Sequence, residues 1–407
     1  MYAAPIRVDF SDPKVLAEPH EAFDCLRAEE PVYWAESIGA WIVTSHSLVV
    51  QALREPALSN ERTKSIVQAQ LGERDAQLAS DFERIVSGMM LMRDGDDHHR
   101  LRVLGNHGFV PSLLRRVRPR IEQLVDELLD EVRPRGQMDV VADLAQPLPA
   151  YVIAAMFDLP IEDRQLFQAA SDAMAKFFGG TLGDKRLDAR AANSATVELE
   201  GFFLKLLAKR RHQSADDLMS LFIAGQDAGK MTPEEVCCQC VLLLVAGHVT
   251  TIDQLSNAAY AFATHFDQWQ LLQHTPELLP AAIEEIMRFD GAVPFVNRVA
   301  KQNVQLGDKT IQTGQLIYLS LLAANHDPAV FDAPHRLDIQ RNRLANIAFG
   351  QGKHVCLGAN LARLELEICL KALTISLPEL RLDPDRPAVR QCDSLSFRGF
   401  RSLPVLF

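Results

Sequence analysis

The sequence is short of basic residues. Its 407 residues include 42 Lys and Arg against 53 Asp and Glu, which gives a formal net charge of −11 and a pI near 5.6. A nucleic-acid binder that works through bulk charge needs the opposite excess, so this class is excluded. Glycine and proline number only 21 each, which excludes collagen-like and low-complexity chains. With 48% hydrophobic residues, the chain can instead build a large core.

Long hydrophobic runs are also missing. The longest run of note, Val241–Ala246, is far shorter than the 18 or so apolar residues of a membrane span. The segment Met1–Pro13 lacks the basic, apolar and small-residue regions of a signal peptide. An odd number of cysteines, seven, does not suit a disulfide framework. We therefore expect a cytoplasmic protein with free cysteines, no membrane anchor and no nucleic-acid partner.

Helical periodicity dominates the remaining sequence, and strands are short. Apolar residues recur at spacings of three and four between Leu114 and Val132, as on one face of a helix. Length alone suggests two or three domains, but strands near both ends with helices between them favour one α-rich domain. The further helical patterns lie at 144–157, 161–177, 190–212, 267–273 and 276–289, and the strands at Val32–Ala35, Trp41–Thr44, Val304–Leu306 and Leu316–Leu319.

The longest helix is predicted to begin after Thr232. Threonine at the N-cap, Pro233 at the first helical position and Glu235 three residues after the cap form a capping box. The pattern continues to about Thr264, roughly 45 Å at 1.5 Å per residue, so its middle should be buried. That middle contains Gly247, and Thr250 can hydrogen-bond back to a carbonyl one turn earlier. Either a bound group or tight helix packing explains a weakened helix centre.

The segment Phe349–Gly358 carries the most specific signal. It places three glycines and Cys356 immediately before a helical run that begins at Ala359. Glycines allow tight turns and a close approach of the backbone to a flat ligand. A cysteine at a helix N-terminus has a stabilised thiolate. Such a soft thiolate is a good axial ligand for haem iron.

This segment resembles the haem-binding signature of the cytochromes P450, Phe-Gly-x-Gly-x-His-x-Cys-Leu-Gly. The resemblance implies a mainly α fold with small β-sheets, in a single P450-type domain over residues 1–407. It also implies a haem b (heme b) cofactor between the long central helix and the cysteine loop, with Cys356 as the axial ligand. The matching residues are Phe349, Gly350, Gly352, His354, Cys356, Leu357 and Gly358. We expect strand-rich parts at about 30–60, 295–320 and 380–407, and helical parts at 90–290 and 355–372.

Two further motifs match the family and would otherwise be read as surface charges. Glu285 and Arg288 lie three apart, on one helix face, and resemble the structural Glu-x-x-Arg pair, with Arg336 as its expected third member. His98 and Arg102 resemble the His-x-x-x-Arg pair that binds the haem propionates. Two other positions that match propionate contacts are Arg298 and His354.

The centre of the long helix resembles the family's oxygen-binding segment. Ala246, Gly247, Thr250 and Thr251 match it, and the resemblance assigns to Thr250 the alcohol that relays protons for O–O cleavage. The sequence departs at Val249, where the family commonly has an acid. Three explanations of this departure are open. Water together with Thr250 supplies the protons, a polar group of the substrate supplies them, or the enzyme has drifted from simple hydroxylation towards another oxidation. His248 is expected to serve packing, since it points about 100° away around the helix.

The resemblance implies a haem-thiolate monooxygenase that uses O2 and two electrons to oxidise a hydrophobic small molecule, in bacterial specialised metabolism. A ferredoxin or flavodoxin would dock near Cys356, where Lys353, Arg341, Arg343 and Arg363 cluster in the sequence. A peroxide-driven or oxidative-coupling enzyme is the alternative that Val249 raises, and a non-catalytic haem sensor is the weaker one. By family position, the substrate pocket includes Met90, Met92, Leu244, Val245, Val249, Val293, Asn297 and Phe397.

Overall fold

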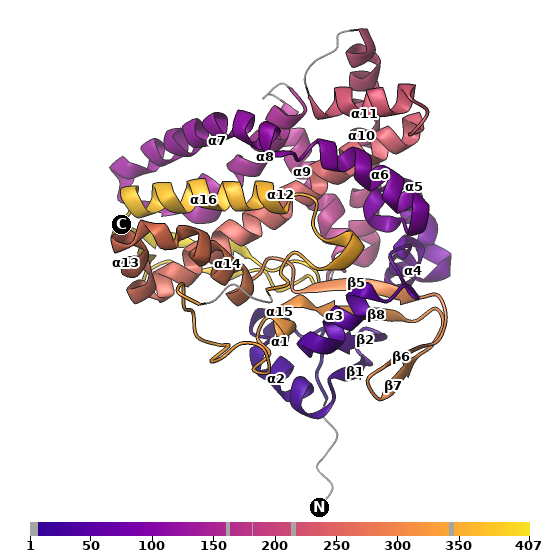
Figure 1. Cartoon of the computed structure of the whole chain (residues 1–407), viewed down its shortest axis with the longest axis horizontal. Coiled ribbons are helices and arrows are strands. Elements are labelled where there is room, and N and C mark those ends of the chain that lie inside the picture. The colour runs from indigo at the N-terminus through magenta and orange to yellow at the C-terminus, as the bar shows by residue number, and fades with distance from the viewer. Residues whose placement is uncertain (1–6, 160–162, 181, 213–216, 342–345) are drawn as a thin grey trace, which may run out of the picture.

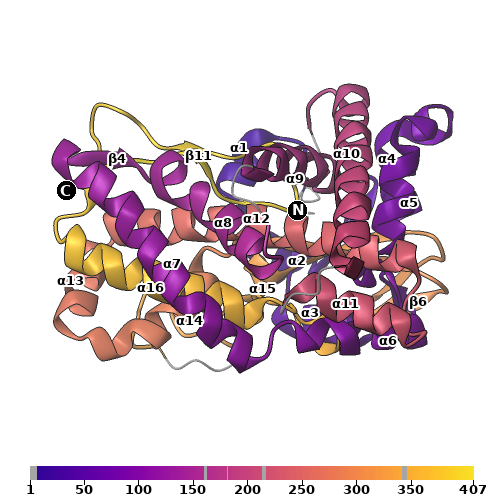
Figure 2. The ribbon, with the colours of Figure 1, turned by 90° about the horizontal axis from the view of Figure 1, so that it is seen from above.

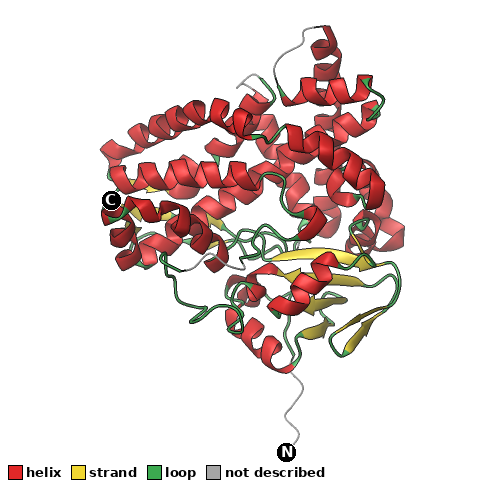
Figure 3. Cartoon of the chain, viewed as in Figure 1, coloured by secondary structure: helices red, strands yellow, loops and turns green. Residues whose placement is uncertain are grey.

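The protein is mainly helical, with its largest sheet at one side and further short strands near the C-terminus, as Figure 3 shows. A computed structural model describes residues 7–159, 163–180, 182–212, 217–341 and 346–407. The α-helices are α1 Pro13–Ala17, α2 His20–Glu29, α3 His46–Arg54, α4 Thr63–Asp75, α5 Ser80–Gly88, α6 Gly95–His107, α7 Pro111–Val132, α8 Pro147–Met156, α9 Arg164–Phe178, α10 Lys185–His212, α11 Leu218–Asp227, α12 Pro233–Thr264, α13 Phe266–His274, α14 Leu279–Phe289, α15 Leu321–Ala324 and α16 Ala359–Ser376.

The strands form small sheets, of which the largest has five strands in the order β1-β2-β8-β5-β3. Within it β2 and β8 are parallel, with Trp41 opposite Ile317, and the other pairs are antiparallel. The smaller sheets pair β6 with β7, β10 with β11, and β12 with both β4 and β9. The strands are β1 Val32–Ala35, β2 Ala40–Val43, β3 Leu58–Ser59, β4 Gln137–Asp139, β5 Phe295–Ala300, β6 Val304–Leu306, β7 Lys309–Ile311, β8 Leu316–Ser320, β9 Arg381–Leu382, β10 Val389–Arg390, β11 Phe400–Ser402 and β12 Pro404–Leu406.

Helix α12 runs through the helical part of the molecule, and α7 lies alongside α16 next to it (Figures 1 and 2). The predicted capping box is present, since Glu235 N–H donates to Thr232 Oγ1 (3.1 Å) and Thr232 N–H donates to the Glu235 carboxylate (2.8 Å). By length and hydropathy α12 meets the usual test for a membrane span, yet 67% of its most apolar window is buried within the protein. It therefore serves as the core helix on which the other helices pack.

The predicted fold class, mainly α with small β-sheets, is confirmed. The boundaries of α12 agree with the predicted ones because the capping box and Pro233 mark its start locally. One pairing differs from the prediction of a single strand set at 304–319. Strand β6 pairs with β7, which the sequence analysis missed, whereas β8 joins the large sheet.

Candidate active site

The loop before α16 presents its cysteine through tight turns. Gly350 and Gly352 have φ values of +70° and +80°, a region that L side chains rarely adopt. Gly350 N–H donates to Ile347 O (2.8 Å) and Cys356 N–H donates to Phe349 O (2.9 Å), so the loop folds back on itself. Both glycines of the sequence motif are therefore required by the backbone path that leads to Cys356.

The Cys356 sulfur lies inside the protein but is not covered by it. Burial raises the pKa of the Cys356 thiol, while the N–H of Gly358 and the charges of Arg102 and Arg363 lower it. Gly358 is the N-cap of α16, so the sulfur lies at the positive end of that helix. The Cys356 side chain is nevertheless accessible. A sulfur that is deep enough for burial to dominate its pKa, and accessible as well, faces a space within the protein.

The centre of α12 borders the same region. Thr251 Oγ1 donates to Glu365 Oε2 on α16 (3.4 Å), which holds the middle of α12 against the helix that begins just after Cys356. Ala246 is exposed although most of α12 is buried, and the neighbouring Thr250 is half-buried. Thr250 Oγ1 donates to Ala246 O (2.8 Å), as predicted. The middle of α12, with its exposed Ala246, is therefore held against the helix that follows Cys356.

Gly247 has a separate reason to be glycine. A Cβ at this position would lie 2.9 Å from Ile153 Cδ1 of α8, closer than ordinary contacts between carbon atoms. Of the two explanations that the sequence left open for the weakened helix centre, tight helix packing is confirmed, because Gly247 permits a close approach to α8. The bound group stays a prediction.

Basic side chains line the region between α6, β5 and the cysteine loop. His98 and His354 stack with their ring centroids 3.9 Å apart. Arg298 is buried, and desolvation lowers its pKa to about 10. Arg102 lies close enough to Cys356 to lower the pKa of the thiol. The structure therefore brings together the four side chains that were predicted to bind propionates.

Arg62, which the sequence analysis missed, belongs to this basic cluster. It is buried, and desolvation together with repulsion from Arg298 lowers its pKa to about 9. Pairing of β3 with β5, with Ser59 opposite Val299, brings the two arginines together. In the described part of the chain neither guanidinium forms an ion pair. The nearby carboxylate of Asp94 is bound to Lys301 (2.6 Å) instead.

These residues fit a haem. Cys356 offers a soft sulfur next to an internal space, and Arg62, Arg102 and Arg298 offer buried or half-buried donors whose charges lack carboxylate partners in the described ranges. Buried cations without partners are costly, and two carboxylates, as in the propionates, would neutralise them.

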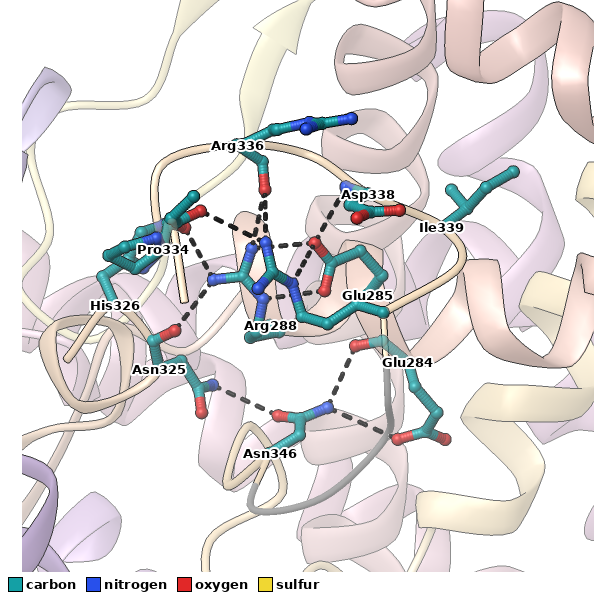
Figure 4. A network of polar contacts seen from close by, with 12 residues as sticks. Glu284, Glu285, Arg288, Asn325, His326, Pro334, Arg336, Asp338, Ile339 and Asn346 are labelled. Carbon is teal, nitrogen blue, oxygen red and sulfur yellow. Dashed lines mark hydrogen bonds and ion pairs between the residues drawn. The ribbon is translucent and has the colours of Figure 1, made fainter. Parts of the chain in front are cut away.

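The predicted ion pair between Glu285 and Arg288 is present, but its third member is not Arg336. Arg288 donates to both Glu285 oxygens at 2.7 and 2.9 Å, and both side chains are buried. Arg341 Nε donates to Glu285 Oε1 (3.1 Å). The Arg336 side chain is exposed and points away from the network in Figure 4, contributing only its carbonyl to Arg288 (3.3 Å) and Arg341 (3.0 Å). The path of the 332–341 loop turns Arg341 inwards, which residue spacing alone does not indicate.

The network reaches the cysteine loop through Asn325. Arg288 donates to the carbonyl of Asn325 (2.9 Å), and the Asn325 side chain accepts from Ile347 N–H (2.9 Å). Asn325 Nδ2 donates to Asn346 Oδ1 (3.2 Å), as Figure 4 shows. Because Ile347 also accepts the turn bond from Gly350, the ion pair braces the loop that carries Cys356.

No ionised acid occupies the position next to Thr250. His248 is buried and burial lowers its pKa to about 4, in agreement with a packing role. Burial also raises the pKa of Asp253 well above its usual value. A carboxyl that the sequence analysis missed, Glu365, lies 3.4 Å from Thr251 Oγ1, and desolvation raises its pKa to about 8. Glu365 sits in an apolar helical pattern and carried no sequence signal.

The predicted pocket residues divide into two groups. Val245, Val249, Val293 and Phe397 are half-buried and can line an accessible space. The other four are packed within the protein, which corrects their assignment: Met90, Met92, Leu244 and Asn297. The reason is clearest for Asn297, whose Oδ1 accepts from Arg62 Nε.

The predicted basic face near Cys356 is smaller than expected. Arg341 is paired with Glu285, and Arg363 donates to Glu284 (2.6 Å) and stacks on Phe349, so neither presents a free positive charge. Lys353 is exposed. Arg343, also named in the prediction, lies outside the described residues.

Comparisons with known proteins agree with this geometry. The family model "Cytochrome P450" matches residues 265–387. The biotin biosynthesis cytochrome P450 of Bacillus subtilis (strain 168) is 32% identical, over 96% of this chain and 97% of its own length. The crystal structure of CalO2 superposes with a TM-score of 0.90 at 30% identity, covering 98% of both chains. P450BioI, solved in complex with an acyl carrier protein ligated to hexadec-9Z-enoic acid, has a TM-score of 0.89 at 31% identity, covering 97% of this chain and 99% of that one. The chain belongs to the cytochrome P450 family.

Proposed function

We propose that this cytochrome P450 is a cytoplasmic monooxygenase of bacterial specialised metabolism, which oxidises a hydrophobic small molecule with O2 and two electrons from a ferredoxin or flavodoxin. The observation that carries the proposal is the accessible Cys356 directly before α16, which the Thr251–Glu365 contact holds against the middle of α12. Biosynthetic relatives, such as the biotin biosynthesis enzyme, support the metabolic role.

Each part of the site has a role in this function. When bound, haem supplies iron that binds and activates O2. Cys356 would ligate the haem iron, and the basic cluster of Arg62, His98, Arg102, Arg298 and His354 would hold the propionates. Thr250 presents its hydroxyl oxygen on the exposed face of α12.

Proton supply is the step where this chain differs from the family pattern. The Val249 side chain has no ionisable proton to donate. Water beside Thr250 and the substrate are therefore the remaining proton donors near Thr250. Behind them, Glu365 retains its proton at neutral pH because its pKa is raised to about 8, and it contacts Thr251 Oγ1. These two groups can hold a proton one residue away from Thr250.

The substrate class follows from the accessible lining. Val245, Val249, Val293 and Phe397 are apolar, so burying an apolar substrate against them contributes about 25 cal/mol per Å². The structure of P450BioI contains a fatty acid on a carrier protein. We therefore include free and carrier-bound acyl chains in the substrate screen.

Turnover with a ferredoxin reductase system tests the proposal. A compound that shifts the spin state of the haem should give a product that carries one oxygen atom from 18O2. Thr250→Ala should lower product per electron and raise peroxide release, while Thr264→Ala, a matched threonine at the far end of α12, should change neither. Lack of 18O incorporation with every spin-shifting ligand contradicts the monooxygenase.

An oxidative-coupling or peroxide-driven enzyme is the second candidate, and Val249 is the observation that favours it. Peroxide would bring its own protons and electrons, so the missing acid would not matter. Turnover with peroxide should then exceed turnover with the reductase and O2. Val249→Asp distinguishes the two: in a monooxygenase limited by protons it raises product and lowers peroxide release, and in a peroxide-driven enzyme it changes neither.

Substitution of Lys353 tests the proposed docking face for the ferredoxin. Charge reversal in Lys353→Glu should raise the KM for the ferredoxin several-fold at low salt and leave substrate binding unchanged. Lys371→Glu is the control, because Lys371 is exposed near the other end of α16. Equal effects of the two variants would place the docking site elsewhere.

A further inference from the structure

Three histidines converge on the side of the molecule away from the cysteine sulfur. His20 begins α2, His326 follows α15, and His335 lies in the loop after it. Their ring centroids are 4.4, 5.5 and 5.2 Å apart, and one nitrogen from each ring lies within 4.8 Å of the other two. Helices α2 and α15 lie close together in Figure 1 and are in contact.

The hydrogen bonds of the rings leave nitrogens free to bind an ion. His326 Nδ1 donates to the carbonyl of Leu322 (3.0 Å), and His335 Nε2 donates to the carboxylate of Asp24 (2.7 Å). Carbonyl and carboxylate oxygens only accept, so these nitrogens carry the hydrogen and the lone pair is on the other nitrogen. Metal-binding histidines use this arrangement, in which the second nitrogen donates to a carbonyl or carboxylate.

Two ring nitrogens are buried and have no hydrogen-bond partner among the residues that the structure describes. They are Nδ1 of His20 and Nε2 of His326. Buried polar atoms in proteins are nearly always hydrogen-bonded, so an unpaired pair at one place needs a partner.

The two arginines that face the cluster are each paired with a carboxylate. Arg288, which faces His326, is paired with Glu285, and Arg398, which faces His20, is paired with Asp290 (2.7 Å). Asp24, whose own partner is Arg27 (2.7 Å), adds a carboxylate at the edge of the cluster.

We propose that His20, His326 and His335 form a binding site for one divalent transition-metal ion of the Zn²⁺ type, with Asp24 orienting His335. Three imidazoles and a water are a known zinc ligand set. Zinc with bonds of about 2.05 Å needs ligand nitrogens about 3.4 Å apart, so nitrogens at the present limit of 4.8 Å would approach one another by about 1.4 Å.

Such an ion would tie the start of the chain to the haem support. His20 belongs to the first helices, whereas His326 is next to Asn325, which connects the Glu285–Arg288 pair to the cysteine loop. Figure 4 shows His326 beside Asn325. The bound metal would therefore stabilise the packing of α2 against the 325–335 segment without touching the catalytic space.

Zinc binding to untagged holoenzyme tests this site. In the holoenzyme Cys356 is bound to the haem iron and does not compete for zinc. The protein is treated with chelator, desalted, equilibrated with Zn²⁺ and assayed for zinc per haem. We expect one zinc per chain, loss of that zinc in His335→Ala, and no loss in His274→Ala. Both substituted histidines are exposed, so neither change should prevent folding. Less than one zinc at saturation, or equal binding in the two variants, overturns the site.

Two further measurements separate a built site from loose surface binding. Zinc K-edge absorption should show nitrogen ligands at about 2.0–2.1 Å with imidazole scattering. Asp24→Asn should weaken binding about tenfold or more, because orienting partners typically contribute that much. Zinc should also raise the melting temperature of the wild type but not that of His335→Ala. A zinc site without imidazole, or unchanged affinity in Asp24→Asn, contradicts the assignment.

Discussion

Arg341 and Arg336 offer a matched test of how the cysteine loop is braced. The two arginines lie in the same loop, and only Arg341 donates to the buried Glu285 carboxylate. Its guanidinium also donates to the carbonyls of Ala333 (3.2 Å) and Arg336 (3.0 Å), and its side chain is only 13% exposed. We predict that Arg341→Ala destabilises the folded protein and that Arg336→Ala does not.

The expected loss in the free energy of unfolding follows from the interactions that remain in each variant. Hydrogen bonds to charged groups contribute about 1.5–3 kcal/mol. Glu285 keeps Arg288 and the Asp338 N–H (3.0 Å) in Arg341→Ala, so no charge is left unpaired. We therefore expect a loss of about 2 kcal/mol in Arg341→Ala, and a change within about 0.5 kcal/mol in Arg336→Ala, whose side chain is exposed.

The assay is denaturant unfolding of the two holo variants at equal haem loading, followed by helical circular dichroism and by the Soret band. In Arg341→Ala we expect haem release at lower denaturant than in wild type, because the network reaches the loop through Asn325. Glu285→Gln should destabilise further, by about 3–5 kcal/mol, since it leaves buried arginines without their charge partner. Equal midpoints for the two arginine variants, or a larger loss in Arg336→Ala, would refute this account of the network.

Two other substitutions test the packing and the titration of the site. A Cβ at Gly399 would overlap Asp253, with Asp253 Cα only 2.7 Å away, so Gly399→Ala should destabilise the folded protein by about 3 kcal/mol or more. Gly201 has no atom within 4 Å of such a Cβ, so the control Gly201→Ala should be neutral or slightly stabilising in a melting experiment. Between pH 4.5 and about 8 the folded protein holds a proton on Glu365 that the unfolded chain releases, so stability falls as pH rises through this window. Glu365→Gln should weaken that fall and be more stable than wild type at pH 8, and an unchanged slope between pH 5 and pH 8 would count against a neutral Glu365.

Local sequence signals account for the parts of the site that were predicted. The start of α12 and the cysteine loop were found because a capping box, glycines and a cysteine act on their immediate neighbours. Arg62 could not be found this way, because its place next to Arg298 results from the pairing of distant strands β3 and β5. Arg341 was assigned to the docking face and not to the ion pair for a similar reason, since the path of a loop decided which arginine turned inwards.

Burial was the other property that the sequence did not reveal. Glu365 occupies one position of an apolar helix, and its raised pKa depends on what packs around it. Met90, Met92 and Leu244 match pocket positions of the family, yet they are buried in the core. Apolar residues satisfy both environments, so only the packed structure separates them.

The absorption spectrum of the reduced, CO-bound protein tests the central claim most directly. A thiolate from Cys356 should give the red-shifted Soret band, and Cys356→Ala should abolish that band. Cys369→Ala, which removes a buried cysteine of α16, the helix that follows Cys356, should keep it. A Soret band of the imidazole type in the wild-type protein, or a red-shifted band that survives in Cys356→Ala, would contradict the assignment of Cys356 as the haem ligand.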